Sequence, residues 1–260
     1  MNYDTITFSL EDGIAAITLN RADVMNALNT QMRAEITHAV TESGTKSRVV
    51  VLTGSGRAFC SGQDLGDRAN AGNLDLDLER TLHDEYEPMI KSIINCPVPT
   101  LAAVNGAAAG AGANLALACD VVIATESAYF LQAFTRIGLI PDAGGSYTLP
   151  RTMGMAKAMG AALFSDKISA RDADNWGLIW EAVDDEAFEG HWKSRASHLA
   201  HGPTKSYESV KRIIRASWNN DLKSQLNLEA SEQGKCGKSR DFREGVLAFV
   251  EKRTPNFEGR

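Results

Sequence analysis

The sequence predicts an α/β core followed by a helical C-terminal region, and two patterns lead to this prediction. Through roughly the first two-thirds of the chain, short apolar runs typical of buried strands alternate with segments of helical periodicity. Beyond Asp184 every segment has helical spacing, and no linker rich in Pro, Gly or Ser intervenes. We therefore expect a core at residues 1–200 and a helical region at residues 201–260.

Short strands and helices alternate through the first half of the chain. Two alternating segments are joined by the turn signal Glu11-Asp12-Gly13, which is typical of a hairpin. Pro97 and Pro99 end a long amphipathic segment. In order, we expect strands at 5–10 and 14–19, a helix at 30–41, a buried strand at 49–52, a helix at 78–94, and strands at 100–104 and 121–124.

The second half of the chain becomes increasingly helical. An Ala- and Met-rich helix is expected at 152–163. Ser169 and Asp172 have the spacing of a capping box at the start of a helix over 169–175, and residues 176–183 end in a short strand. The last expected helices are 186–199, 203–218, 221–235 and 239–251.

Composition and charge exclude several classes of protein. The net charge of −6 over 260 residues disfavours a nucleic-acid surface, and no apolar run approaches the length of a membrane span. The acidic, alternating N-terminus does not resemble a signal peptide. The four cysteines form no C-x-x-C pair, and the five histidines have no metal-ligand spacing. We expect a cytoplasmic protein with reduced thiols, no bound metal, and neither nucleic acid nor membrane as a partner.

The chain is organised around residues 104–120, VNGAAAGAGANLALACD, where a strand runs into a helix start crowded with glycine and alanine. Small side chains let a ligand approach the backbone, and the first turn of a helix leaves N–H groups unpaired. The stretch is therefore a candidate oxyanion or anion site, although tight helix packing without a ligand fits it equally well. A dinucleotide fingerprint is disfavoured because Leu115 occupies the third glycine position.

Four motifs in order resemble those of the crotonase family, the enoyl-CoA hydratase/isomerase superfamily. They are AFCSGQDL at 58–65, the stretch at 104–120, GLIPDAGG at 138–145 and WGLIWEAV at 176–183, and the resemblance extends over essentially the whole chain. It implies a spiral of ββα units with a helical C-terminal region that mediates trimerisation, giving a trimer or a dimer of trimers. It also implies an acyl-CoA substrate, with coenzyme A as part of the substrate and no separate cofactor.

By motif position, the resemblance places the two backbone N–H donors of the family's oxyanion hole at Gln63 and Ala111. Most family members have glycine at the second position. Alanine keeps the N–H, and Gly110 beside it keeps the approach open. Removing a proton next to a thioester puts negative charge on the carbonyl oxygen, and two preorganised donors stabilise that charge.

The resemblance also separates possible acid–base groups. Hydratases of the family use two glutamates, and this chain has Asn114 and Phe134 at those positions, so hydration by that route should fail. Asp142 stands where isomerases of the family have a proton-shuttling aspartate. Its apolar neighbours in the sequence predict a raised pKa, which suits a catalytic base. In the alternative, Asp142 caps a helix beginning at Ala143.

Further residues are expected to form the substrate site. Glu87 could be a second acid or a solvated charge, and Asp64 could hold the loop that presents Gln63. Arg21 and Arg68 could contact CoA phosphates or be solvated, and Lys252 and Arg253 could reach a neighbouring subunit's nucleotide. The residues expected to bind substrate are Ala27, Leu28, Ala58, Ser61, Gly62, Asp64, Leu65, Tyr86, Gly110, Phe134 and Pro141.

The expected function is acyl-CoA isomerisation. Within the family, the motifs are most similar to those of isomerases that convert 2-(1,2-epoxy-1,2-dihydrophenyl)acetyl-CoA to the oxepin-CoA in aerobic phenylacetate catabolism, and a shift of a double bond in an enoyl-CoA is also open. An aryl-CoA dehalogenase is disfavoured because Phe134 and Glu87 stand where such enzymes have tryptophan and histidine. A non-catalytic CoA-ester or RNA-binding protein is disfavoured by Asp142 and by the acidic charge.

Overall fold

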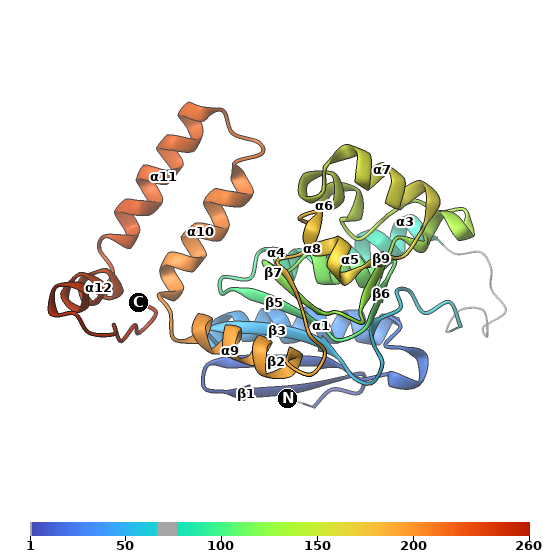
Figure 1. Cartoon of the computed structure of the whole chain (residues 1–260), viewed down its shortest axis with the longest axis horizontal. Helices are drawn as coiled ribbons and strands as arrows, with labels where there is room; N and C mark the ends of the chain where they lie inside the picture. The colour runs from blue at the N-terminus through green and yellow to red at the C-terminus, as the bar shows by residue number, and fades with distance from the viewer. Residues whose placement is uncertain (1, 67–76) are drawn as a thin grey trace.

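Two β-sheets and the helices that cover them make up the core (Figure 1). The computed structural model describes residues 2–66 and 77–260. Within these residues, one sheet has the order β1-β2-β3-β5-β7-β10 and the other the order β4-β6-β8-β9. The strands of the first sheet are Ile6–Glu11, Ile14–Leu19, Val49–Gly54, Thr100–Val104, Val121–Thr125 and Glu181–Val183, and those of the second are Ala58–Cys60, Ala107–Ala109, Tyr129–Leu131 and Ile168–Ser169.

The first sheet begins with the predicted hairpin. Asp12 and Gly13 take positive φ angles of 48° and 77°, and the turn joins β1 to β2 in an antiparallel pair that matches Glu11 with Ile14. From β2 onwards, the neighbouring strands β3, β5, β7 and β10 run parallel. Parallel strands are usually buried on both faces, which explains the continuous apolar runs in β3 and β5 that predicted them.

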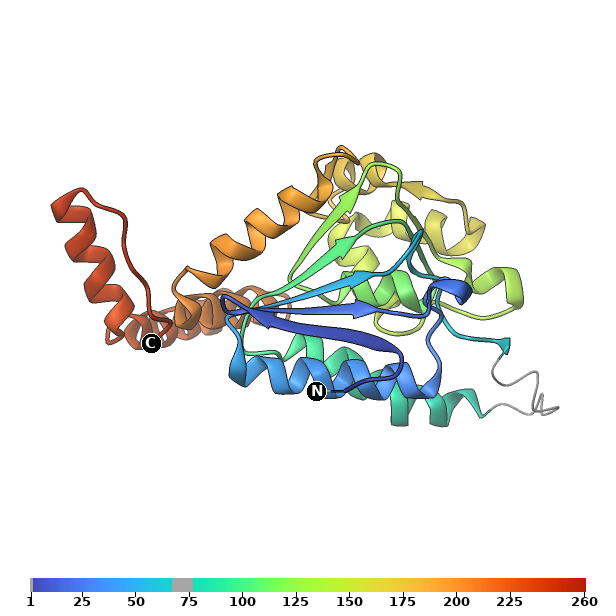
Figure 2. The ribbon, with the colours of Figure 1, turned by 90° about the horizontal axis from the view of Figure 1, so that it is seen from below.

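Alternate residues of β3 pack into different layers, because successive side chains of a strand point to opposite faces. Val50 and Leu52 belong to a large core cluster shared with α1 (Thr30–Lys46) and α4 (Glu87–Ile94). Val49 and Val51 pack instead with residues of α9 (Phe188–Ala200). Figure 2 shows α1 and α9 on opposite sides of this sheet. The second sheet contributes to the larger cluster, so its strands lie on the α1 side.

The helix expected at 78–94 is not uniform. It consists of α3 (Leu78–Thr81), a π-helical turn η2 (Leu82–Tyr86) and α4, with Pro88 in the first turn of α4. A π-helical turn is uncommon and is often found at functional sites. The amphipathic pattern predicted the helical character of the segment but contained no signal for the π-helical turn.

Two elements near the glycine-rich motifs differ from the sequence predictions. β6 forms from three alanines that carried no strand pattern, whereas α5 (Ala111–Leu117) begins within the glycine- and alanine-rich stretch, where a helix start was expected. α6 (Gly145–Thr152) was expected only in the alternative that starts a helix at Ala143, because the segment begins with glycine and contains Pro150. As a result, the helix expected at 152–163 begins at Gly154, as α7 (Gly154–Phe164).

The remaining core elements are short. Ser169 caps α8 (Ala170–Asn175), since the backbone N–H of Asp172 donates to its hydroxyl at 3.1 Å, as the capping-box spacing predicted. Two short 3₁₀ helices, η1 (Ala22–Val24) and η3 (Ala133–Ile137), lie in loops. Among the helices of the described residues, we find none with the length and apolar character needed to cross a membrane.

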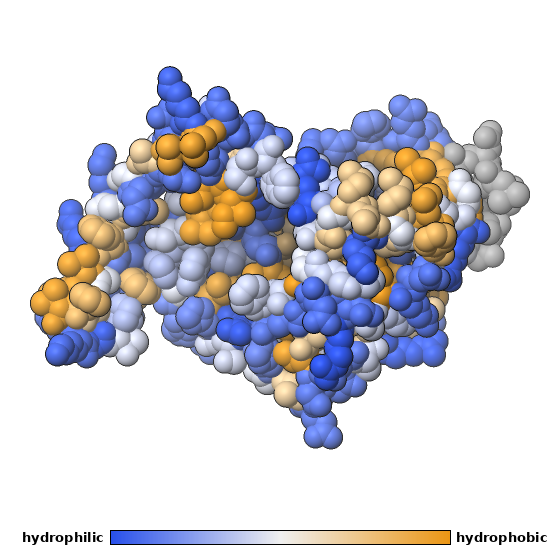
Figure 3. All heavy atoms as spheres, turned by 45° about the horizontal axis from the view of Figure 1, so that its top comes forward, coloured by the Kyte–Doolittle hydropathy of each residue, from blue (hydrophilic) through white to orange (hydrophobic). Residues whose placement is uncertain are grey.

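An arm of three helices extends from the core (Figure 1): α10 (Thr204–Ala216), α11 (Leu222–Cys236) and α12 (Arg240–Glu251). Arg48 ties both ends of the arm to the core, because its guanidinium donates to the backbone oxygens of Gly202 and Phe257. Ile214 and Trp218, which keep helical spacing in the sequence, are 61% and 63% exposed. Figure 3 shows apolar surface gathered over this arm. The division at residues 200 and 201 stays a prediction.

Candidate active site

A cavity of about 700 Å³ lies between the segment α3–η2–α4 and the loop before α6. Of the residues predicted for the site, Gln63, Tyr86, Pro141 and Asp142 line it. Apolar side chains form much of its wall, among them Leu78, Leu82, Ile90, Leu139 and Ile140. A mostly apolar cavity with a few polar groups is typical of a small-molecule site.

The loop that carries Gln63 is held by a parallel bridge to Leu28. The N–H of Leu28 donates to the carbonyl of Gly62 at 2.8 Å, and the N–H of Asp64 donates to the carbonyl of Leu28 at 3.1 Å. The N–H of Gln63 lies between these two bonds in sequence and makes no hydrogen bond within residues 2–66 and 77–260. Its backbone donor is therefore available to a ligand.

The second predicted donor, Ala111, begins α5. Gly110 before it has φ 53° and ψ −129°, a conformation essentially restricted to glycine. As the first residue of a helix, Ala111 has no helical carbonyl to accept from its N–H. A Cβ built on Gly62 would lie 3.6 Å from the Ala111 nitrogen, so the two loops adjoin. The geometry thus brings to neighbouring loops two backbone donors that are unpaired among the described residues, an arrangement that can stabilise an oxyanion.

Asp142 lies in the loop between η3 and α6. Its Oδ1 is buried and has no hydrogen-bond partner among the described residues. Burial raises the pKa of the Asp142 carboxyl from 3.8 to about 6, in the direction predicted from its apolar neighbours, and only a bond from its own backbone N–H acts against this. A carboxyl group with such a pKa can both accept and return a proton near neutral pH.

The alternative in which Asp142 caps a helix starting at Ala143 is wrong. α6 begins at Gly145, its N-cap is Gly144, and no side chain accepts a capping bond there. Ala143 has φ 48°, which lies in the left-handed region and cannot start a right-handed helix. The Asp142 carboxyl is therefore not used to cap α6.

Arg33 is a residue of the site that the sequence analysis missed. Its side chain is 2% exposed, and its guanidinium donates to the carbonyl of Leu28 at 2.7 Å, pairs with Glu85 and stacks over Tyr86 at 4.7 Å from the ring centroid. The Tyr86 hydroxyl in turn donates to Oε1 of Gln63 at 3.2 Å, and burial raises the pKa of Tyr86 well above its usual range. Arg33 thus braces the loop of Gln63 from behind. In the sequence, the one weak indication of this role was that Arg33 follows Met32, which lies on the apolar face of α1.

Other predicted residues surround the two loops. Phe134 is buried, and a Cβ on Gly110 would lie 3.8 Å from its ring. Arg21 forms a 2.8 Å salt bridge with Asp64 and donates to the carbonyl of Ala27, so these two charges hold the loop together. Ala27, Leu28, Ala58 and Gly62 are buried, Ser61 and Gly110 are half-buried, and Leu65 is exposed.

Of the remaining charged candidates, Glu87 and Arg253 are paired. Glu87 bonds to Lys91 and His83, and these bonds lower its pKa, as expected for a solvated helix-face charge. Arg253 pairs with Glu244 and Glu251, and Lys252 ends α12. Arg68 lies outside the described residues.

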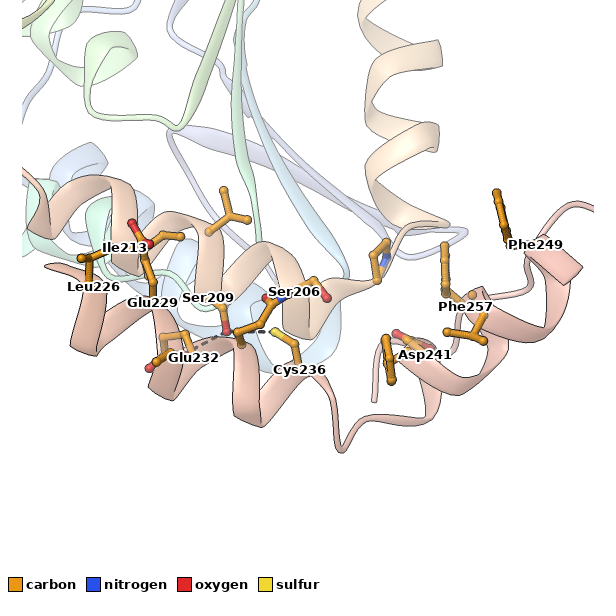
Figure 4. Close-up of a pocket in the computed structure, with 17 residues that line it drawn as sticks. Ser206, Ser209, Ile213, Leu226, Glu229, Glu232, Cys236, Asp241, Phe249 and Phe257 are labelled. Carbon is orange, nitrogen blue, oxygen red and sulfur yellow. Dashed lines mark hydrogen bonds between the residues drawn. The ribbon is translucent and has the colours of Figure 1, made fainter.

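A second cavity, of about 900 Å³, lies between the helices of the arm (Figure 4). Two of its carboxylates are engaged: Glu232 accepts from the Ser209 hydroxyl at 3.0 Å, and Asp241 accepts from the backbone N–H groups of Glu258 and Gly259. Hydrogen bonds to Lys235, Ser209 and Arg212 outweigh desolvation and lower the pKa of Glu232. The first cavity is therefore the candidate active site.

A desolvated carboxyl group in one cavity with an unpaired backbone donor is typical of enzymes that move a proton beside a carbonyl group. The sequence profile of the enoyl-CoA hydratase/isomerase family matches residues 9–260. The chain belongs to this family, the crotonases, and is an enzyme that acts on CoA thioesters.

Individual relatives agree with this assignment. The chain is 60% identical over 260 residues to a Rhodobacter capsulatus protein named “probable enoyl-CoA hydratase”, with 100% of both chains covered. It is 43% identical over 258 residues to the 1,2-epoxyphenylacetyl-CoA isomerase of Escherichia coli, covering 96% of this chain and 97% of the relative. A crystal structure of an enoyl-CoA hydratase from Bacillus anthracis matches with a TM-score of 0.93 and 31% identity, covering 99% and 100% of the two chains. The predicted family and fold are confirmed.

Proposed function

We propose that this protein is an acyl-CoA isomerase in which Asp142 moves the proton. One observation carries the proposal: the carboxyl group of Asp142 is desolvated in the cavity, with its pKa raised to about 6. Asn114 and Phe134, at the positions where family hydratases hold glutamates, are both buried, and neither side chain can exchange a proton.

The proposed reaction is a proton transfer along the acyl chain. The Asp142 carboxylate takes a proton from the carbon next to the thioester carbonyl, and the electrons of the broken C–H bond form an enolate. The backbone N–H groups of Gln63 and Ala111 stabilise its oxygen, each contributing about 10²–10³ in rate. Asp142 then returns the proton to the γ carbon, and the double bond moves into conjugation with the thioester. The proton is conserved, and no step requires a further cofactor.

The proposed substrate is 2-(1,2-epoxy-1,2-dihydrophenyl)acetyl-CoA. Cleavage of the ring bond between the two epoxide carbons gives a seven-membered oxepin in which a double bond lies β,γ to the thioester. The same transfer from the α to the γ carbon then gives the conjugated oxepin-CoA. Two findings support this choice: the 43% identity to the E. coli isomerase, and the apolar cavity wall, which suits a carbon ring.

Hydration is the second candidate, because the R. capsulatus relative is named for it. Adding water to crotonyl-CoA requires one group to activate the water and one to deliver a proton. With Asn114 and Phe134 at the glutamate positions, we expect crotonyl-CoA hydration to be very slow. A hydration rate comparable with that of a true hydratase would contradict the proposed roles of these positions.

The deciding experiment follows the proton directly. The purified protein is incubated in D₂O with the ring-epoxide CoA ester and, in parallel, with a 3-enoyl-CoA. We expect deuterium at the α carbon and formation of the conjugated product, and neither with Asp142→Asn. A wild-type protein that binds acyl-CoA but neither exchanges an α proton nor forms the conjugated product would overturn the proposal in favour of a binding protein.

A further inference from the structure

The side chain of Asn114 connects the helix of one oxyanion donor to the loop of the base. Asn114 is 2% exposed and lies in α5, one turn after Ala111. Its Nδ2 donates to the backbone oxygen of Asp142 at 2.8 Å. The N–H of Gly145 donates to the same oxygen, also at 2.8 Å, so two donors hold this carbonyl.

The orientation of the Asn114 amide is itself fixed. Nε2 of Gln132 donates to Oδ1 of Asn114 at 3.0 Å, which leaves Nδ2 to face the Asp142 carbonyl. Gln132 is held by the Ser165 hydroxyl, which donates to its backbone oxygen at 2.7 Å. The contact also needs glycine at position 145, because a Cβ there would lie 2.8 Å from Cγ of Asn114.

We propose that Asn114 is a positioning residue, which sets the Asp142 carboxyl relative to the backbone donor of Ala111. The proposal rests on the proposed isomerase function. A side chain that donates to a carbonyl cannot be replaced by a carboxylate, which would place two acceptors against each other. Asn114 therefore has a role of its own at the position where family hydratases have a glutamate. A misplacement of about 1 Å can cost about 10²-fold in rate, so we expect its loss to lower kcat by about 10- to 100-fold.

The first test is Asn114→Asp. The introduced carboxyl still accepts from Gln132 but can donate to Asp142 only while protonated. Wild-type kcat/KM should rise with pH through about 6 and then level off, whereas the variant's kcat/KM should rise and then fall, with the affinity for a CoA thioester unchanged. Other ionisable groups lining the cavity are common to both proteins, namely Glu79, His83, Tyr86, Glu87 and Lys91. A high-pH plateau equal to the wild-type value would overturn the proposal.

The second test is a double-mutant cycle that does not require the first variant to fold. Gly145→Ala should displace the Asn114 side chain and lower kcat about 10-fold or more. In an Asn114→Ala background the overlapping atoms are gone, so Gly145→Ala should have little further effect. Equal losses in the two backgrounds would show that Gly145 acts independently of Asn114, against the proposal.

A matched control exists in the arm. Nε2 of Gln225 donates to the carbonyl of Ile213 at 3.0 Å, and its Oε1 accepts from Asn220 at 3.0 Å, the same pattern of bonds. Gln225→Glu should leave kcat and its pH profile unchanged. The same loss in this control as in Asn114→Asp would mean that any such broken bond lowers kcat, and would remove the support for a positioning role.

A readout without substrate separates this inference from the proposed function. The Asp142 carboxyl is followed by ¹³C NMR during a pH titration and assigned with Asp142→Asn. In Asn114→Asp, the like charge of the introduced carboxylate should raise the pKa of Asp142 above its wild-type value. An unchanged titration would refute the positioning contact, whereas absence of both α-proton exchange and conjugated product with the wild-type protein would refute only the isomerase.

Discussion

At the scale of single residues, the unusual property of this site is the carboxyl of Asp142. Its pKa is raised chiefly because it is buried, and no cation among the residues that the structure describes offsets the burial. Oδ1 lacks a partner among the described residues, although buried polar atoms are normally hydrogen-bonded. An unsatisfied buried carboxyl is costly for folding but useful for proton transfer. Its raised pKa brings the free energies of the protonated and ionised forms close together near neutral pH.

Replacing Asp142 tests the proposed mechanism most directly. Asp142→Asn is nearly isosteric, and α6 does not depend on the side chain for its cap, so the fold should survive. Turnover should fall by about 10²–10⁴, the usual contribution of a general base. CoA-ester affinity should persist, because the proposed oxyanion donors are backbone groups. Turnover, affinity and melting temperature are measured on the same variant, and near-normal turnover would eliminate Asp142 as the base.

The raised pKa also predicts how activity depends on pH. The base must be ionised to accept a proton, so kcat/KM should decline as pH falls below about 6, the pKa of Asp142 in the free enzyme. A profile that stays flat down to pH 4.5 would mean that the pKa is not raised or that another group is the base.

Stability should follow the opposite direction. Because the folded-state pKa lies above the ordinary value, protonation of Asp142 stabilises the fold below pH 3.8, and this contribution is lost as pH rises through about 6. A difference between 3.8 and about 6 corresponds to at most about 3 kcal/mol. Asp142→Asn should therefore gain stability relative to wild type at pH 8, and the gain should shrink at pH 4. Denaturant unfolding at the two pH values measures this, and an equal effect at both would contradict it.

The sequence predicted some of these residue properties and not others. The apolar neighbours of Asp142 were enough to predict the direction of its pKa. The bond from Asn114 to its backbone could not be predicted, because it joins residues 28 positions apart through the packing of α5 against the loop before α6. The pairing of the buried Arg33 with the half-buried Glu85, 52 positions away, is a similar long-range contact.

At the scale of elements, the direction of the first N–H of α5 depends on the backbone conformation of a single glycine. Gly110 holds φ 53° and ψ −129°, and Gly112 packs so closely on β4 that a Cβ would lie 2.6 Å from Sγ of Cys60. The start of the helix is thus fixed by the backbone conformation of Gly110 and by the close packing of Gly112 on β4.

Apolar runs made the strands predictable from the sequence. The elements α6 and β6 were not predictable in this way, because they depend on tertiary packing that outweighs weak local preference.

Gly110→Ala tests the helix start. Alanine in this conformation costs about 1–3 kcal/mol of strain, which the chain can relieve by shifting the Ala111 N–H. We expect kcat to fall by about 10²–10³, the value of one oxyanion donor. Gly154→Ala is the control, because Gly154 also has positive φ, 77°, but lies at the start of α7 with nothing within 4 Å of its added Cβ. Similar losses of kcat in the two variants would attribute the effect to backbone strain alone.

At the scale of the whole molecule, the arm of α10–α12 exposes several large apolar side chains. Phe242, Val246, Phe249 and Val250 are 53%, 48%, 86% and 71% exposed. Exposed apolar groups gathered on one part of a protein often mark an interaction surface. The order of the helices was predictable from their periodicity, but which faces stay exposed depends on how the arm sits against the core.

We expect the protein to be a trimer or a pair of trimers, with contacts through the arm. With a chain mass of 28.1 kDa, light scattering should give about three or six times that value. Phe249→Lys should weaken the assembly, while Lys223→Gln, on the first turn of α11, serves as a charge-changing control. A stable monomer at micromolar concentration would contradict this expectation.

The close packing of α5 on Cys60 also supplies a natural reporter of motion. The Cys60 thiol is fully buried, and burial raises its pKa to about 12, so a reagent that attacks thiolates can reach it only when the strand and helix separate. The rate of Cys60 alkylation in the native enzyme therefore counts the local openings of α5 from β4, much as amide exchange counts openings of a backbone bond. A CoA ester that binds the first turn of α5 should slow this reaction. Mass spectrometry of Cys60 alkylation can therefore measure how often α5 opens from β4 with and without ligand.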